Sequence, residues 1–441
     1  MLKAVGDFVH ELGFADLPPE VVEQARRCLL DLVGVAITGH GTELSRIVRD
    51  FAAHNMAGDR RPASLWLDGR VVSPAGAALA NAATIDAMDA HDGHRLSKGH
   101  AGAALLPATI ATAEGSGTTI REVLTTLVVG DEVATRAGIA LHASAEDYHS
   151  SGAWNSIGAA AVAARSLGLD RAASEHALGI AEYHGPRAPM MRGIGHPTMV
   201  KDSSGWGAHT GVSAALLAAE GFTGAPAQLI DSPSADSLWH DLGDRWLIME
   251  QYFKRHPVCR WAHPAVDAMI ELRREHHVEP EAIRVIEVDT FAPATTLLRG
   301  IPVTTEEAQY SLAFPVAAAA VHGAVLPSLV HRPDLADDRL RRLADGMLVR
   351  ESPTMTAAFP ALREADVTLV LADGRRISSG PTTACGDPEQ PLSRSTLIEK
   401  FRAGARPVLG DDRAERLLAV LTAEQDLELA ELTDQLCPPI G

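Results

Sequence analysis

The residues best suited to chemistry lie close together, between Asp86 and His100. These fifteen residues contain three aspartates, three histidines, one arginine and one lysine, and Ala-rich apolar segments flank them on both sides. Ionisable groups are rare in apolar surroundings unless they are paired or used. Histidine next to a carboxylate can take up and release a proton near neutral pH. The segment therefore indicates a site of proton transfer.

The same segment also contains residue types that bind divalent metals. His91 and His94, together with the nearby aspartates, are legitimate zinc ligands. Because their spacing matches no known zinc motif, we predict no metal site. Some of these residues are instead expected to cap or close the loop.

Three further residues each precede a segment that is predicted to be helical. They are His100, His149 and Lys201, and a serine that can cap the helix follows the second and the third. The N-terminus of a helix binds anions and disfavours a protonated imidazole. If the three helix ends converge, they form an anion site with neutral histidines. The alternative is that polar residues simply collect at helix starts.

A third cluster of ionisable residues spans residues 252–263. Two cations, Lys254 and Arg255, stand next to each other, and His256, Arg260 and His263 follow. This pattern predicts a hinge between domains that faces an anion, or alternatively a solvated linker. Cys259 lies in the cluster without a recognisable Cys-His signature, so a nucleophilic role is not predicted.

The positions of the elements define the fold class. Helical periodicity over residues 19–39, 73–88, 101–114, 119–141, 153–167, 171–182 and 205–220 predicts a multi-helix core. Residues 284–291 alternate like a strand, and residues 366–371 and 375–379 flank a hairpin signal. Further helices are expected at 305–323, 338–347, 392–403, 411–421 and 423–436. We therefore predict a mainly α protein, with a large all-helical domain over 1–264, completed by 392–441, and a smaller α+β lid domain over 265–391.

Composition narrows the class of partner. The net charge of −18 and the aromatic content of 4% make nucleic acid and anionic membranes poor candidates. Neither a signal peptide nor an apolar run of about 18 residues is recognisable. The four cysteines are scattered, which is typical of reduced thiols. A cytoplasmic protein with a small-molecule ligand is expected.

Six segments, in order, resemble the MmgE/PrpD family, which includes 2-methylcitrate dehydratase, cis-aconitate decarboxylase and iminodisuccinate epimerase. They begin with N-A-A-T-I-D-A-M-D-A-H-D-G-H (81–94) and continue with Y-H-S-S-G-A-W-N (148–155), V-K-D-S-S-G-W-G (200–207), F-K-R-H-P-V-C-R-W-A-H (253–263), T-E-E-A-Q-Y-S-L-A-F (305–314) and P-L-S-R-S-T-L-I-E-K-F (391–401). The resemblance implies a large helical domain with an α+β lid, a homodimer, and no metal or organic cofactor.

The resemblance also assigns residues. It implies that the catalytic residues are Asp89, His100, His149, Lys201 and Lys254. The chain departs from the family around His91, Asp92 and His94, and Phe314 stands where members acting on cis-aconitate carry a tyrosine. We expect the following residues to contact the substrate: His91, Asp92, His94, Arg255 and Phe314.

The shared chemistry of such a family is proton transfer at a carbon next to a carboxylate. The site must neutralise that carboxylate, which Lys201, Lys254 and the helix ends would do, while one histidine acts as base and the other as acid. The main hypothesis is a cofactor-independent lyase that dehydrates or decarboxylates a small di- or tricarboxylate. The alternatives are an isomerase or epimerase of a small dicarboxylate, and a non-catalytic binding protein of the same fold.

Overall fold

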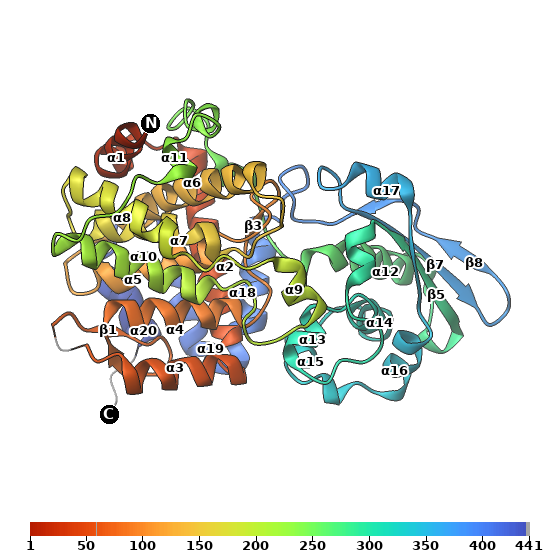
Figure 1. Cartoon of the computed structure of the whole chain (residues 1–441). Coiled ribbons are helices and arrows are strands. Elements are labelled where there is room, and N and C mark those ends of the chain that lie inside the picture. The colour runs from red at the N-terminus through yellow and green to blue at the C-terminus, as the bar shows by residue number, and fades with distance from the viewer. Residues whose placement is uncertain (59, 438–441) are drawn as a thin grey trace.

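The computed structural model describes residues 1–58 and 60–437, and these form two lobes (Figure 1). One lobe is mainly helical, with short two-stranded ladders, and the other combines helices with a larger sheet. The sequence predicted this division but not the short ladders. The main helices of the first lobe are α1 (Leu2–Glu11), α2 (Pro19–Gly39), α3 (Glu43–Asn55), α4 (Pro74–Asp86), α5 (Gly102–Ala113), α6 (Ile120–Ser144), α7 (Gly152–Ser166), α8 (Arg171–His184) and α10 (Ser204–Ala219).

The chain returns to the helical lobe at its end. Helices α18 (Arg394–Leu409), α19 (Asp411–Leu421) and α20 (Leu429–Leu436) lie there, with α18 packed on α2 (Figure 1). We propose that the two lobes are the two domains, the first made of residues 1–264 and 392–441 and the second of residues 265–391.

Small residues allow the central helices to pack closely. Every residue of α4 and of α5 is buried. Where α10 crosses α7, a Cβ atom on Gly211 would lie 2.5 Å from the Cβ of Ala159 and 2.6 Å from the backbone nitrogen of Ala160. The two backbones can therefore approach this closely only because position 211 has no side chain. This close packing explains the Ala- and Gly-rich sequences of these helices.

The second lobe, here called the lid lobe, is built on a sheet with the order β6-β5-β7-β8, with β9 also paired to β7. The strands are β5 (Ile283–Thr290), β6 (Leu348–Glu351), β7 (Glu364–Leu371), β8 (Arg376–Ser378) and β9 (Thr382–Thr383). β5 runs parallel to β6 and antiparallel to β7. Alternate residues of β7 are buried, and α12 (His263–His276) packs on that strand. The predicted hairpin is confirmed as β7 and β8, which pair antiparallel.

Two predicted helices differ from the observed ones. The helix expected over 305–323 is split into α13 (Thr305–Gln309) and α14 (Ala313–His322), because the Ser311 hydroxyl accepts the backbone N–H of Phe314 and donates to the carbonyl of Leu298. The helix expected over 423–436 begins only at Leu429, because the residues before it pair with the start of α6: the N–H of Ile120 donates to the carbonyl of Leu427 at 2.8 Å.

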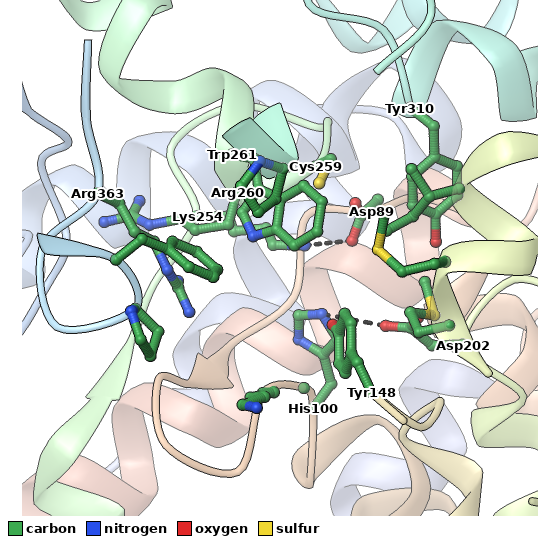
Figure 2. A pocket seen from close by; sticks show the side chains of 18 of the residues that line it. Asp89, His100, Tyr148, Asp202, Lys254, Cys259, Arg260, Trp261, Tyr310 and Arg363 are labelled. Atoms are coloured by element: carbon green, nitrogen blue, oxygen red, sulfur yellow. Dashed lines mark hydrogen bonds and ion pairs between the residues drawn. The ribbon is translucent and has the colours of Figure 1, made fainter. Parts of the chain in front are cut away.

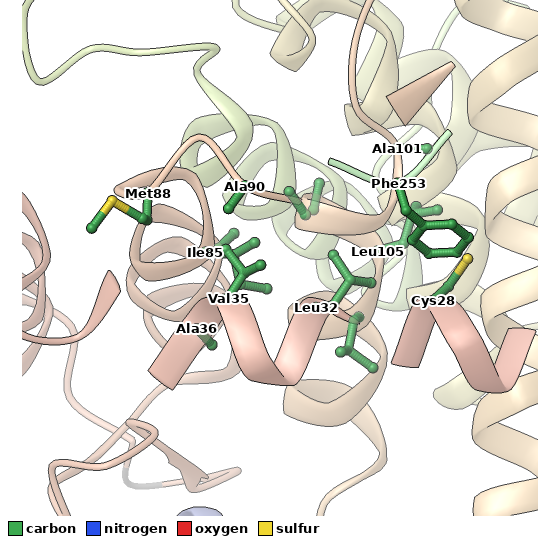
Figure 3. Close-up of a cluster of buried hydrophobic side chains, with 14 of the residues drawn as sticks. Cys28, Leu32, Val35, Ala36, Ile85, Met88, Ala90, Ala101, Leu105 and Phe253 are labelled. Atoms are coloured by element: carbon green, nitrogen blue, oxygen red, sulfur yellow. The ribbon is translucent and has the colours of Figure 1, made fainter. Parts of the chain in front are cut away.

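A short antiparallel ladder brings distant segments to one place. β3 (Gly93–His94) pairs with β4 (Gln251–Tyr252), so the loop rich in aspartate and histidine lies against the segment that carries Lys254. Apolar side chains of α2, such as Leu32 and Val35, pack with Ala90 and Phe253 beneath these segments (Figure 3). The polar loop therefore rests on a rigid apolar base.

Candidate active site

A cavity of about 190 Å³ lies where the loop, the segment after β4 and the lid lobe meet (Figure 2). Its polar lining comes from both lobes. The ionisable residues on its wall are Asp89, Lys98, His100, Tyr148, Asp202, Tyr252, Lys254, Cys259, Arg260, Tyr310 and Arg363. Methionine, isoleucine, proline and aromatic side chains form the rest of the wall. A small molecule that combines polar groups with apolar atoms would fit this lining.

Asp89 and Lys254 form a buried ion pair in direct contact (Figure 2). Burial alone would raise the pKa of Asp89, but the ammonium groups of Lys254 and Lys201 outweigh it and hold that pKa well below its usual range. Gln309 of α13 supports the pair, because its side-chain oxygen accepts the backbone N–H of Asp89 at 2.8 Å and the Lys201 ammonium at 2.5 Å. A residue of the lid lobe thus fixes two charged groups of the helical lobe.

The His100 ring lies between a backbone carbonyl and a carboxyl group. Its Nδ1 is 2.5 Å from the carbonyl oxygen of Asp92, and its Nε2 is 3.2 Å from Oδ2 of Asp202. Since a carbonyl oxygen only accepts, Nδ1 carries a hydrogen. Burial, and next the charge of Lys254, lower the pKa of His100 well below its usual value, so the imidazole is neutral near pH 7. Such a ring can exchange a proton through Nε2.

The remaining wall carries cations. The guanidinium of Arg260 is engaged with Asp387 at 2.9 Å and lies 4.9 Å from the ring centroid of Tyr252. The guanidinium of Arg363 lies 5.4 Å from the same centroid, and the residue is 8% exposed. Within residues 1–58 and 60–437, no hydrogen bond or ion pair reaches the Arg363 guanidinium, and its Nε is buried without a partner. A buried cation without a counter-ion makes this wall suited to an anion.

Three of the five predicted catalytic residues line the cavity: Asp89, His100 and Lys254. Lys201 does not line it. Its ammonium lies 4.6 Å from the ring centroid of Tyr310, a residue of the cavity wall, and Lys201 borders another hollow beside α10. Lys201 therefore contacts Tyr310 and Gln309, and its charge lowers the pKa of Asp89.

His149 lies outside the cavity. Its Nδ1 donates to the carbonyl of Asp147 at 2.8 Å, and its backbone N–H donates to Nε2 of His142 at 3.1 Å. The neighbouring Tyr148 reaches the cavity in its place. The sequence led us to expect that His100 and His149 converge on one site. Of these two, His100 lines this cavity and His149 does not.

None of the predicted substrate-contacting residues lines this cavity. His91 packs edge-on behind His100 with ring centroids 4.2 Å apart, Asp92 offers its carbonyl from below, and His94 lies 3.6 Å from Glu250. Arg255 is half exposed near Asp267, and Phe314 is fully buried in α14, four residues after the cavity-lining Tyr310. The first three support the His100 loop because they are buried beneath it.

The helix starts also differ from the expectation. Neither Ser151, before α7, nor Ser203, before α10, makes a capping hydrogen bond with its side chain. The Ser151 hydroxyl instead accepts the backbone N–H of His100 at 3.0 Å, and Asp86 accepts the N–H of Ser204 at 3.2 Å. These contacts tie the start of each helix to the loop, which explains why the residues before the helices gather there.

Sequence reasoning missed several residues of the cavity. Asp202 directly follows Lys201 within a recognised motif, so its place beside the site could have been inferred. Tyr310 likewise lies within a recognised motif, four residues before Phe314. Arg363 precedes β7 in a segment with no pattern of its own, and only the fold brings it to the cavity.

The cavity coincides with unusual backbone. Lys98 on its wall, and Lys201 and Ser203 beside it, have φ values of 55°, 48° and 59°, in the left-handed region that side chains disfavour. Three of the five described non-glycine residues with positive φ therefore gather at or beside one site. Strained backbone tends to cluster where function requires a particular geometry.

The described residues offer neither a cluster of metal ligands nor a helix suited to a membrane. No group of three or more His, Cys, Asp or Glu side chains among residues 1–58 and 60–437 could hold a metal ion. His91 and His94 face different carboxylates, Asp86 and Glu250, each at 3.6 Å. Among the helices that the structure describes, none combines the length and the apolar character needed to cross a bilayer.

Fold and site together define a two-lobed protein with an acid–base cavity between a helical lobe and a lid. The chain belongs to the MmgE/PrpD family: residues 3–236 match the MmgE/PrpD N-terminal domain, and residues 256–425 match the MmgE/PrpD C-terminal domain.

Three relatives share little sequence identity with this chain, but the similarity extends over nearly the whole chain. Cis-aconitate decarboxylase of Homo sapiens is 26% identical over 460 residues, which cover 97% of this chain and 93% of that protein. The enzyme of the same name from Mus musculus is 27% identical, with 97% and 92% covered. That of Aspergillus terreus is 24% identical, with 98% and 95% covered. The similarity of this chain to the family and to these decarboxylases therefore extends over both lobes.

Proposed function

We propose that this protein is a cofactor-independent lyase of a small di- or tricarboxylate, and that its reaction is decarboxylation. The observation that carries the proposal is that Arg363, a buried guanidinium without a counter-ion among the described residues, shares one cavity with the neutral imidazole of His100. The first can hold a carboxylate of the substrate, and the second can exchange a proton with its carbon.

The mixed lining of the cavity suits the loss of carbon dioxide. A carboxylate leaves as neutral carbon dioxide more readily where water is excluded, and Met190, Ile194, Trp261 and Phe359 contribute apolar surface to the wall. The electron pair left on the substrate carbon then needs a proton, which His100 is placed to deliver. The ion pair of Asp89 with Lys254 keeps a positive charge next to that carbon.

The revised set of proposed catalytic residues is smaller than the predicted one. Asp89, His100 and Lys254 keep their roles, whereas His149 is no longer included. Lys201 is proposed to hold Tyr310 and Gln309 in position. Arg363, rather than Arg255, is proposed to bind the substrate carboxylate.

The test is turnover followed by NMR in D₂O. Purified protein is incubated with cis-aconitate, and separately with 2-methylcitrate and with simple dicarboxylates. We expect cis-aconitate to lose carbon dioxide and to give a dicarboxylate, one carbon shorter, that carries one solvent deuterium at carbon. The variant His100→Ala should abolish this, whereas His240→Ala, at an exposed histidine, should not.

Other outcomes would contradict the proposal. Exchange of deuterium into recovered substrate without loss of carbon dioxide would show an isomerase. Loss of water alone would show a dehydratase, and binding without exchange or turnover would show a binding protein.

We also propose that the protein forms a homodimer. Val200 and Trp206 are 65% and 52% exposed next to a largely apolar hollow beside α10, which a second copy could cover. Light scattering after size exclusion measures the mass directly, and the mass of a single chain would contradict the proposal.

A further inference from the structure

A carboxyl group to which the sequence assigned no role lies next to His100. Oδ2 of Asp202 is 3.2 Å from Nε2 of the ring, and both residues line the cavity (Figure 2). Asp202 is 5% exposed. Its Oδ1 is buried without a hydrogen-bond partner in the described chain, and its Oδ2 receives only a long contact of 3.5 Å from the Ser151 hydroxyl. Apart from His100, little stabilises a negative charge on this carboxyl.

The geometry of the ring limits where hydrogens can be. Nδ1 of His100 already donates to the carbonyl of Asp92. The contact between Nε2 and Oδ2 is therefore a hydrogen bond only if it contains one more proton, located either on Asp202 or on the ring. A fully deprotonated pair would place two lone pairs against each other in a buried site, which is unfavourable.

The surrounding charges favour retention of that proton. Asp202 is close to the carboxylates of Asp86 and Asp89 and to the lysines Lys201 and Lys254; burial, and next the two carboxylates, raise the pKa of Asp202. The phenols of Tyr148 and Tyr310 also lie within its electrostatic reach.

The surroundings of His100 oppose a charge on the ring on balance. Burial, Lys254 and His91 lower its pKa well below the usual value, and they outweigh Asp89, which acts in the opposite direction. The Tyr252 ring also lies near, 6.4 Å between centroids. Near neutral pH the pair of Asp202 and His100 therefore carries one transferable proton in total and no net charge.

We propose that Asp202 is a positioning residue that acts through His100 and stores the proton that the reaction delivers to the substrate carbon. This deepens the proposed function and rests on it. When the bond from the substrate carbon to its carboxylate breaks, carbon dioxide leaves and the electron pair stays on the carbon. The proton of Asp202 moves onto Nε2 of His100, and Nε2 passes this one proton to the carbon, which leaves Asp202 as a carboxylate. The pair is left one proton short and regains it from water.

A second buried pair of aspartate and histidine provides a matched control. Asp267 and His256 are 2.9 Å apart, and both are buried outside the cavity. There, burial would raise the pKa of Asp267, but the hydrogen bond and charge of His256 outweigh it and lower that pKa. Near neutral pH, Asp267 should therefore be ionised, whereas Asp202 should be protonated.

The first test needs no substrate. Infrared spectra of the full chain near pH 7 should contain the carbonyl stretch of a protonated carboxyl group that disappears in Asp202→Asn and persists in Asp267→Asn. In ¹⁵N NMR spectra, the Nε2 signal of His100 should shift in the first variant only. Absence of both changes overturns the proposal, whether or not any carboxylate is turned over.

The second test uses a substrate identified as described above. Asp202→Asn should lower kcat at least tenfold with little change in KM and should move the pH profile of kcat, and Asp202→Glu should restore part of the rate. If Asp202→Asn keeps the wild-type rate and pH profile, the proposal is wrong. If no carboxylate is turned over, the proposed function fails, and the infrared test alone decides whether Asp202 stores a proton.

Discussion

The ion pair of Asp89 with Lys254 predicts a large and non-additive effect on stability. Both side chains are almost completely buried, with 6% and 1% of their surface exposed. Two unit charges about 3 Å apart attract by about 5 kcal/mol at an effective dielectric constant of about 20. Removing one partner leaves the other as an uncompensated buried charge, which typically costs roughly 3–5 kcal/mol. Removing both partners and replacing them with apolar side chains avoids that cost.

The assay is a double-mutant cycle on the free energy of unfolding. Asp89→Leu and Lys254→Met are each expected to lower it by roughly 3–5 kcal/mol, and the double variant should be more stable than either single variant. Urea unfolding followed by circular dichroism measures all four proteins. The exposed pair of Arg332 with Asp334 is the control, and its removal should leave the free energy of unfolding almost unchanged.

The pair also predicts a dependence on acid. Because the folded-state pKa of Asp89 lies below its unfolded value, the stabilisation is complete above about pH 4 and is lost as the pH falls further. The double variant should lose less stability below pH 4 than the wild type. The reasoning is refuted if either single variant is as stable as the wild type, or if the double variant is as unstable as the sum of both.

Three further predictions concern other parts of the molecule. Arg363→Met should raise the KM or Kd for a carboxylate substrate about 10- to 100-fold, since a charge-assisted hydrogen bond contributes roughly 1.5–3 kcal/mol. Arg350→Met, at an exposed site, should leave these constants unchanged. Equal constants for Arg363→Met and the wild type in steady-state kinetics would contradict the prediction. Burial raises the pKa of Asp131 to about 7. The stability that Asp131 contributes as a neutral acid is therefore lost as the pH rises toward and through 7, by up to about 4 kcal/mol. In urea unfolding at pH 5 and pH 8, Asp131→Asn should remove part of this loss, and an unchanged pH dependence would contradict the prediction. Gly211→Val should destabilise the helical lobe by more than about 1–3 kcal/mol, because its Cβ would overlap with Ala159; a wild-type melting temperature would contradict this.

Local sequence predicted much of the fold. Apolar periodicity located α2 at its observed ends and α19 likewise, because both helices bury one face and have clear start and stop residues. The break between α13 and α14 was missed because it depends on Ser311 bonding to Leu298, which is a tertiary contact. The late start of α20 was missed for the same reason, since residues before it pair with α6.

The candidate site was less predictable than the fold. Asp89 and His100 lie in one loop, so their proximity follows from the sequence, whereas Lys254 joins them only through the ladder of β3 with β4. The motif that contains His149 lies beside the cavity, but the His149 side chain donates to the carbonyl of Asp147, and the sequence does not reveal this contact. Arg363 comes from the lid lobe and could not be assigned before the lobes were placed together.

The left-handed residues beside the cavity limit how stable this chain can become. A side chain in that conformation costs roughly 1–3 kcal/mol relative to relaxed backbone, and glycine would remove most of the cost. Glycine at Lys98 or at Lys201 would therefore favour the folded state while it deletes a cation that the cavity uses or depends on. Selection for thermal tolerance and selection for activity thus act in opposite directions at these positions. Stabilised variants of this protein should be sought on α3 or in the sheet of the lid lobe, away from that conflict.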